Sequence, residues 1–231
     1  NYADSVEVIR ERNRKIDAMA STIRKHVPQL DAKYLDPAVS TFDRQIGHTE
    51  VLLGALISGL TNVVAFTVDE LGHRYTGIPG IEGEKVNMHD VGHGKSIGGL
   101  DAETIRELAR THHMTLMDRI VKRLKSVPEG NGTMFDNTMV FYFPDGGETH
   151  HSHGWEYPFI IVSGDNARVD LRRRYIRLPN YGQPGHSTLG NFYTTLLNAY
   201  GNPVEHYGAL DTGLSKFGHG QTGPIKSFLS A

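Results

Sequence analysis

The spacing of apolar residues predicts two helices in the first part of the chain. In residues 4–26, apolar side chains recur at close to helical spacing on a charged background, which predicts an amphipathic helix that Pro28 ends. The members of this apolar stripe are Val6, Ile9, Ile16, Met19 and Ile23. A second helix is expected to begin near Pro37, because proline is favoured in the first helical turn, and to run to about Leu60.

Two further helices are predicted from residue 100 onward. The segment 100–127 opens with the capping residue Asp101 and has acidic residues early and basic residues late, which the helix dipole favours. The turn 128–132, which contains proline and glycine, ends this helix. A closing helix is predicted over 186–200, just ahead of Gly201.

Fully apolar runs predict strands that are covered on both faces. These runs are 62–68, 138–143 and 158–162. The glycine-rich stretch 74–99 shows no periodicity and is expected to be a long loop. Strands that alternate with helices predict a three-layer α/β/α fold with a mostly parallel sheet, in which ligands bind at the carboxyl ends of the strands. We expect 61–231 to form one α/β domain that carries a metal site, with the helical segment 1–60 packed on it.

Composition narrows the classes of function. A formal net charge of -2 does not indicate binding to nucleic acid or to an anionic membrane. The longest apolar stretch, 51–60, is too short for a transmembrane segment. The absence of cysteine excludes disulfides, thiolate metal sites and cysteine nucleophiles. Because the sequence opens at Asn1 rather than at an initiator methionine, we expect a processed product or a fragment that lacks an N-terminal portion.

Histidine is the residue type that points to chemistry, since the chain holds 13 histidines and no cysteine. Several histidines lie in clusters with carboxylates, close to the predicted strands. Imidazole and carboxylate ligands indicate a divalent metal, with zinc favoured and calcium or manganese as alternatives. Such a site supports either hydrolytic chemistry or a structural metal.

The first cluster directly follows the predicted strand 62–68. Asp69 leaves the strand and His73 lies four residues further on, after a glycine. Because Gly72 permits a tight bend, both side chains can turn toward one metal ion. The alternative interpretation is a solvated turn with an incidental histidine.

The second cluster lies between the two later strands. Its candidate ligands are Asp145, Glu148, His151 and His153. Asp145 emerges at a strand end, and the paired glycines after it allow the backbone to approach a ligand closely. Side chains alternate along an extended segment, so not all three of its imidazoles can reach one ion, whereas Asp145 with one or two of them can. The alternative is a polar surface loop.

The glycine-rich stretch 74–99 carries a third group, His89 and His93. These side chains can supply a metal ligand, a general acid or an oxyanion contact if the stretch folds over the site. The alternative is a mobile loop with incidental histidines. His112 and His113 are adjacent on a predicted helix and cannot both face one site, so packing is favoured for them. Four isolated histidines are expected to be structural, namely His26, His48, His206 and His219.

The order of these motifs resembles that of the alkaline phosphatase–sulfatase superfamily. In that superfamily an Asp-x-x-x-His pair and a later Asp-His-Gly with a following histidine supply ligands to two metals. Asp69 with His73, and Asp145 with His153, stand in the matching order. Residues 85–231 also resemble an uncharacterised family of exported bacterial proteins in the same group, which usually carries a twin-arginine signal. The resemblance implies an alkaline-phosphatase-like fold, bound divalent metal and a periplasmic or extracellular location.

The sequence departs from the superfamily pattern at two points. Gly146 stands where the superfamily has the histidine of Asp-His-Gly, which removes a ligand from the second metal. No serine, threonine or cysteine stands in the context of the superfamily's nucleophile. Either the nucleophile lies in a missing N-terminal portion or this chemistry is absent, so no catalytic residue is assigned.

Two functions therefore remain open at the level of sequence. The first is an exported hydrolase that uses its metal to cleave a phosphate or sulfate ester of a small molecule. The second is a catalytically degenerate relative that acts as a binding or assembly subunit with a protein partner. A basic strip gives the second function a surface for an acidic partner, although a solvated face explains the strip as well. The strip consists of Arg168, Arg172, Arg173, Arg174 and Arg177.

Overall fold

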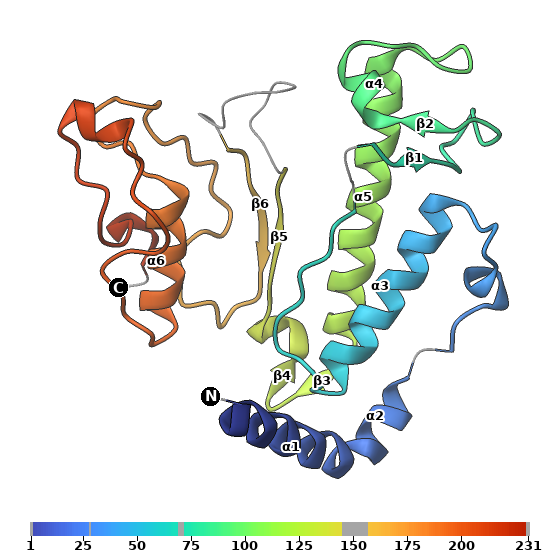
Figure 1. Cartoon of the computed structure of the whole chain (residues 1–231), viewed down its shortest axis with the longest axis horizontal. Coiled ribbons are helices and arrows are strands. Elements are labelled where there is room, and N and C mark those ends of the chain that lie inside the picture. Colours follow the sequence, from blue (N-terminus) through green and yellow to red (C-terminus); the bar gives the residue numbers. More distant parts are fainter. Residues whose placement is uncertain (1, 28, 69–71, 145–156, 230–231) are drawn as a thin grey trace. The chain divides into compact units, whose positions relative to one another are not determined.

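The computed structural model describes residues 2–27, 29–68, 72–144 and 157–229, and the chain divides into two compact units (Figure 1). Unit 1 comprises residues 1–134 and unit 2 comprises residues 135–231. None of the helices in these described ranges has the length and apolarity that crossing a membrane requires.

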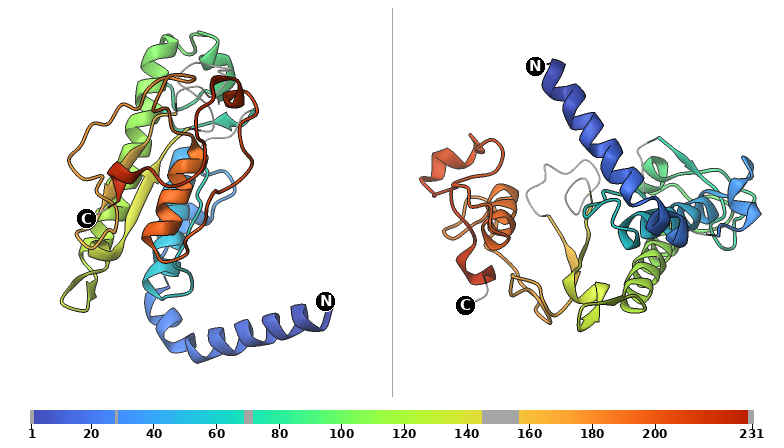
Figure 2. Two further views of the ribbon diagram at one scale, coloured as in Figure 1. Left: turned by 90° about the vertical axis from the view of Figure 1, so that its left-hand side faces the viewer. Right: turned by 90° about the horizontal axis from the view of Figure 1, so that it is seen from below.

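Unit 1 is mainly helical. Its helices are α1 (Tyr2–Ala18), α2 (Ala20–His26), η1 (Ala32–Leu35), α3 (Thr41–Ile57), α4 (Met88–Gly92) and α5 (Ala102–Lys125). The helix predicted over 4–26 is therefore divided at Met19, whereas the helices predicted from Pro37 and Leu100 are present with shorter ends. Ser40 caps α3 and Asp101 caps α5, each by accepting a hydrogen bond from a backbone N–H three residues later. Helix α3 packs along α5 (Figure 2).

The stretch 74–99 is a structured part of unit 1, so the prediction of a long loop there was wrong. It contains β1 (Arg74–Tyr75), β2 (Val86–Asn87) and α4. Its apolar side chains are buried with residues of α3 and α5 in one core, which consists of Phe42, Tyr75, Ile78, Ile81, Val86, Val91, Ala102, Ile105 and Ala109. These side chains follow neither a helical nor a strand period, and for that reason periodicity did not reveal them.

Unit 2 is built around one hairpin and one helix. Its regular elements are β5 (Met139–Tyr142), β6 (Ile160–Ser163), α6 (Leu189–Ala199), η3 (Leu214–Phe217) and η4 (Lys226–Phe228), with η2 (Met134–Asn137) at the boundary between the units. The predicted strands 138–143 and 158–162 and the predicted helix 186–200 are thus present with adjusted ends. The buried core of this unit consists of Val169, Leu171, Phe192 and Phe228.

The predicted three-layer fold with a mostly parallel sheet was wrong. The described residues form three sheets of two strands each, and all three are antiparallel: β1–β2, β5–β6 and the small hairpin of β3 (Pro128–Glu129) with β4 (Gly132–Thr133). The run 62–68 is not a strand, and the side chain of Val63 is 82% exposed. A run of apolar residues becomes a buried strand only where other strands pair with it, and this run has no such partner in the described part of the chain.

Candidate functional site

The β1–β2 pairing brings three of the predicted ligands to one end of a hairpin in unit 1. In the antiparallel register, Arg74 lies opposite Asn87. His73 directly precedes Arg74, and α4 starts directly after Asn87 and carries His89. His73 and His89, which are separated in sequence, are therefore neighbours in the topology, and His93 follows at the end of α4.

His73 is held against the first turn of α3. Its Nε2 lies 3.5 Å from Oγ1 of Thr41, and its ring meets the ring of Tyr75 edge-on at a centroid distance of 5.0 Å. Thr41 and Thr76 bond reciprocally, because the backbone N–H of each donates to the side-chain oxygen of the other, at 3.0 and 3.2 Å. Because Thr76 directly follows β1, the end of this strand is fixed to the first turn of α3.

Val68, which directly precedes the Asp69-x-x-x-His73 motif, is also fixed to α3. The carbonyl oxygen of Val68 accepts one hydrogen bond from the hydroxyl of Tyr75, at 3.2 Å, and another from the side-chain amide of Gln45. Tyr75 and Gln45 are both buried. Asp69 itself lies outside the described residues, but the positions on both sides of 69–71 are anchored by hydrogen bonds.

His89 and His93 form a close pair on α4. Their ring centroids are 4.8 Å apart with an interplanar angle of 73°. Residues four apart lie on the same face of a helix, which explains why the rings meet. Asn87 fixes the start of this turn, since its side-chain oxygen accepts a hydrogen bond from the backbone N–H of His89 at 2.9 Å.

Asp90 adds a carboxylate to this hairpin end. Lys95 donates a hydrogen bond to Asp90 at 3.0 Å and lowers the pKa of that carboxyl, and the charges of Lys95, His89 and Arg74 lower it further. The end of the hairpin thus combines three imidazoles with one ionised carboxylate. Within the described ranges, however, no three histidine, aspartate or glutamate side chains converge closely enough to hold a metal ion.

The second predicted cluster lies outside the described residues. This applies to Asp145, Glu148, His151 and His153. They belong to the connection between β5 and β6, and the register Tyr142↔Ile160 shows that this connection joins the two strands of an antiparallel hairpin. Three aromatic rings flank the connection, with centroid distances of 5.3 to 6.2 Å. They belong to Phe143, Tyr157 and Phe159.

Unit 2 contains a cluster of hydrogen-bonded polar side chains that the sequence did not indicate. The hydroxyl of Tyr181 donates to Asp211 at 2.9 Å, and the Tyr181 ring lies 5.6 Å from the ring of His186. Nδ1 of His186 donates to the carbonyl of Pro179 at 2.8 Å, and Nε2 of His219 donates to the carbonyl of Gly182 at 2.9 Å. In the neutral form, each ring then presents its other nitrogen as an acceptor. Tyr181 and Asp211 are 30 residues apart and Gly182 and His219 are 37 residues apart, so no local spacing could have indicated these two contacts.

Burial raises the pKa of the Tyr181 phenol, and the bond to Asp211 raises it further. The phenol is thereby kept in its protonated, donating form. Gly213 and Gln221 hold Asp211 in place, since the backbone N–H of Gly213 donates to its carboxylate at 2.7 Å and the Gln221 amide donates to its carbonyl at 2.9 Å. The Tyr181–Asp211 pair is therefore a fixed element of this unit.

Unit 1 has two grooves beside α3 and α5. One has a volume of about 570 Å³ and is lined by Ile46, Glu50, Thr115, Leu116, Asp118, Arg119, Lys122 and Arg123. A second, of about 500 Å³, shares Glu50, Arg119 and Arg123 with it. The ion pair between Arg119 and Glu50, at 2.7 Å, stands in the wall of both. None of the predicted ligands lines either groove.

The basic strip of unit 2 is partly neutralised by its own neighbours. Arg172 pairs with Asp165, and Arg174 pairs with Asp170 at 3.2 Å. The Arg168 guanidinium lies over the ring of Tyr200 at 5.8 Å. These contacts support the interpretation of the strip as a solvated face.

Comparisons with protein-family models, curated proteins and solved structures found no match to this chain.

Proposed function

We propose that this chain is a divalent-metal-binding protein whose principal site is formed at the end of the β1–β2 hairpin. His89 and His93 are the central ligands, and His73 and Asp69 complete the donor set. The observation that supports this most directly is the contact between the two imidazoles of α4, at 4.8 Å between ring centroids. Two histidines four residues apart on a helix can present nitrogen ligands to one ion.

The environment of His73 gives the second support. Thr41 and Tyr75 restrain its ring on the side of α3. Groups that hydrogen-bond or pack against a ligand orient it and reduce the conformational entropy lost on binding. Zinc is the ion proposed first, because imidazole nitrogen with a carboxylate oxygen is a common ligand combination for it, with manganese or calcium as alternatives.

The proposed activity is the metal-assisted hydrolysis of a phosphate or sulfate ester. A bound divalent ion polarises an ester oxygen and lowers the pKa of bound water. The residues of this chain would hold the ion and restrain its ligands. A binding or assembly role without catalysis, in an extracytoplasmic location, is the alternative that the same metal site allows.

Metal content measures the first part of the proposal. The full chain, purified without chelator, would be titrated with zinc, manganese and calcium, and bound metal and melting temperature would be recorded. We expect His89→Ala and His93→Ala each to weaken zinc binding by roughly 10-fold or more, as loss of a ligand or its support does. His48→Ala is the matched control, because His48 is an exposed histidine on α3 of the same unit.

Two outcomes would contradict the proposal. The first is wild-type zinc affinity in a folded double variant that lacks both His89 and His93. The second is loss of affinity in His48→Ala of the same size. Hydrolysis of phosphomonoester, phosphodiester and sulfate-ester substrates would then be measured with the metal-loaded chain. Activity that is lost in His73→Ala supports the hydrolase, whereas bound metal without turnover supports the non-catalytic role.

A further inference from the structure

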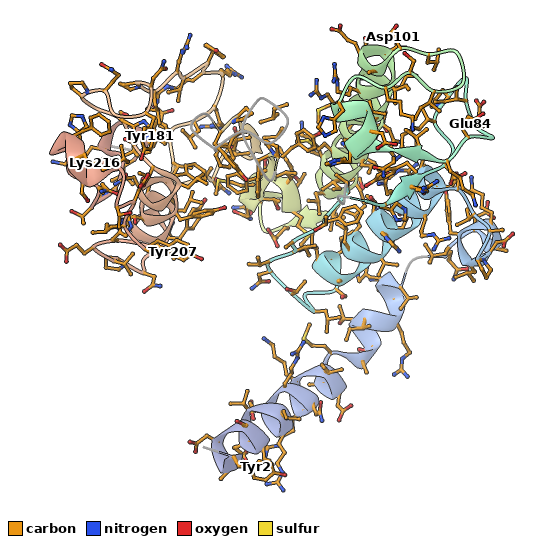
Figure 3. The ribbon with its side chains drawn as sticks, turned by 45° about the horizontal axis from the view of Figure 1, so that its top comes forward. Tyr2, Glu84, Asp101, Tyr181, Tyr207 and Lys216 are labelled. Carbon is orange, nitrogen blue, oxygen red and sulfur yellow. The ribbon has the colours of Figure 1, made fainter. Side chains whose placement is uncertain are left out.

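Helix α1 leaves an apolar stripe unburied along its whole length. None of its 17 residues is buried. The side chains of Tyr2 and Ile9 are 86% and 58% exposed, and Figure 3 shows Tyr2 standing at the first turn of the helix. Apolar side chains that stay accessible in a regular row are typical of an interaction surface.

The stripe follows the seven-residue repeat of a coiled coil. Within α1, the positions separated alternately by four and three residues are Tyr2, Val6, Ile9, Asn13 and Ile16. In heptad notation Val6 and Asn13 occupy a positions, and the others occupy d positions. The one polar residue in the row, Asn13, stands at an a position, where asparagine sets the register and the number of strands.

The opposite face of α1 is occupied by ion pairs within the helix. Arg14 pairs with Glu7 at 3.0 Å and with Glu11 at 2.9 Å. Glu7 and Arg14 are b positions and Glu11 is an f position, which point away from the seam of a coiled coil. The charged face is therefore suited to water, and the apolar stripe is the face suited to a partner.

The charges beside the stripe distinguish between the possible arrangements of two copies. In a parallel, in-register pair, Arg12 at a g position faces Asp17 of the second copy at an e position, and symmetry repeats this attraction. An antiparallel pair with Asn13 against Ile9 of the other copy places Arg10 opposite Arg10 and Arg12 opposite Arg12. Like charges at these positions are unfavourable, so the sequence favours the parallel pair.

We propose that two copies of this chain associate through α1 as a parallel, in-register, two-stranded coiled coil. Ile9 and Ile16 fill d layers of the seam, and Asn13 pairs with Asn13 of the second copy across an a layer. The helix supplies fewer heptads than a stable isolated coiled coil usually has, so the dimer dissociates on dilution. This proposal is independent of the metal site, because no proposed ligand lies on α1.

The oligomeric state of the full chain tests the proposal. Sedimentation would be measured from about 5 to 500 μM, since dimer formation depends on concentration. We expect the weight-average mass to rise toward twice that of the monomer, and Ile9→Asp to abolish the rise. Val8→Asp is the matched control, because Val8 is 67% exposed on the same turn but lies at a c position, outside the seam. An unchanged rise in Ile9→Asp, or an equal loss in Val8→Asp, would overturn the proposal.

Disulfide cross-linking tests the orientation. The chain has no cysteine, so a single Val6→Cys substitution gives an unambiguous product. A parallel pair places the two introduced thiols in one layer, and oxidation yields a covalent dimer of this variant alone. A covalent dimer that forms only when Val6→Cys is mixed with Ile16→Cys would indicate the antiparallel pair and overturn the proposed register.

Charge reversal tests the predicted ion pair between the copies. Arg12→Asp is expected to weaken association, and Asp17→Arg in the same chain is expected to restore it, because the exchanged charges attract again. If the chain remains monomeric at all concentrations and Ile9→Asp lowers its melting temperature, the stripe packs within its own chain and the proposal fails.

Discussion

The rings of Phe42 and His112 lie in parallel, with a centroid distance of 3.9 Å and an interplanar angle of 6°. This stack joins α3 to α5 at the core of unit 1, where Phe42 is buried. Nε2 of His112 is also buried, without a hydrogen-bond partner in the described part of the chain. A protonated imidazole in this position would bury a positive charge, so the folded state favours the neutral ring.

The stack therefore predicts how stability depends on pH. Burial, followed by the neighbouring His113, lowers the pKa of His112 from 6.5 to about 4, although Asp43 acts in the opposite direction. Below pH 6.5 the unfolded chain takes up a proton that the folded chain does not. The contribution of His112 to the free energy of unfolding is thus fully present above pH 6.5 and is lost as the pH falls toward 4. Because the ring is only partly buried, we expect a loss of about 1–2 kcal/mol.

His112→Phe is the variant that measures this contribution. It keeps an aromatic ring on Phe42 and removes the titrating group, so the free energy of unfolding should change less between pH 7 and 4.5 than in the wild type. Urea unfolding at several pH values gives the comparison. His48→Gln, on the exposed side of α3, should leave the pH dependence as in the wild type. An equally steep dependence in His112→Phe would show that other groups cause it.

The approach of α6 to His206 predicts a strong coupling between two positions. A methyl group on Gly190 would lie 2.5 Å from Cε1 of His206. Alanine in place of glycine normally stabilises a helix by up to about 1 kcal/mol, but here we expect Gly190→Ala to destabilise unit 2 by about 1–3 kcal/mol. In a His206→Ala background the cost should fall by at least about 0.5 kcal/mol. Additive effects of the two substitutions in urea unfolding would refute this contact.

Gly164 is expected to be intolerant of any side chain. A Cβ atom at this position would collide with the backbone of Phe135 and Asp136. Because backbone cannot move aside as a flexible side chain can, Gly164→Ala should destabilise unit 2 by about 3 kcal/mol or more. Gly220→Ala is the control in the same unit, since a methyl group there would have no atom within 4 Å beyond its chain neighbours. Equal melting temperatures for the two variants would contradict the close approach.

The capping box at the start of α6 predicts an order of effects. Oγ1 of Thr188 accepts from the backbone N–H of Asn191 at 3.2 Å, and the Asn191 side chain accepts from the backbone N–H of Thr188 at 2.9 Å. Asn191 also donates to the carbonyls of Gln221 and Gly223, both at 2.9 Å. Thr188→Ala should cost about 1 kcal/mol of stability. Asn191→Ala should cost more, because it also leaves two carbonyls without their donor.

Hydrogen exchange over α6 (Leu189–Ala199) measures how far the loss of the cap weakens this helix locally. Urea unfolding gives the total change in the free energy of unfolding. Thr188→Ser, which retains the hydroxyl, should remain close to the wild type. If Thr188→Ala and Asn191→Ala cost the same, the link from Asn191 to the C-terminal segment contributes nothing.

The residues of the candidate site could be named from the sequence, but their arrangement could not. His89 and His93 were candidate ligands in a predicted loop, and their rings meet because a helical turn, α4, forms there instead. That His73 lies next to α4 could not be predicted, because it depends on the pairing of Arg74 with Asn87 across a stretch without periodicity. The Tyr181–Asp211 pair likewise arises from the folding of unit 2 and has no local signature.

The sequence by itself determined the longer helices α3, α5 and α6. Segments such as 102–125 and 189–199 carry their apolar period, caps and end signals within themselves, and helical hydrogen bonds are local. Only the tertiary structure decided the sheets, because a strand's hydrogen bonds are made to another segment. The runs 138–143 and 158–162 are equally suited to parallel and antiparallel neighbours, and their pairing with each other made the hairpin. The run 62–68 found no strand partner in the described part of the chain and did not become a strand.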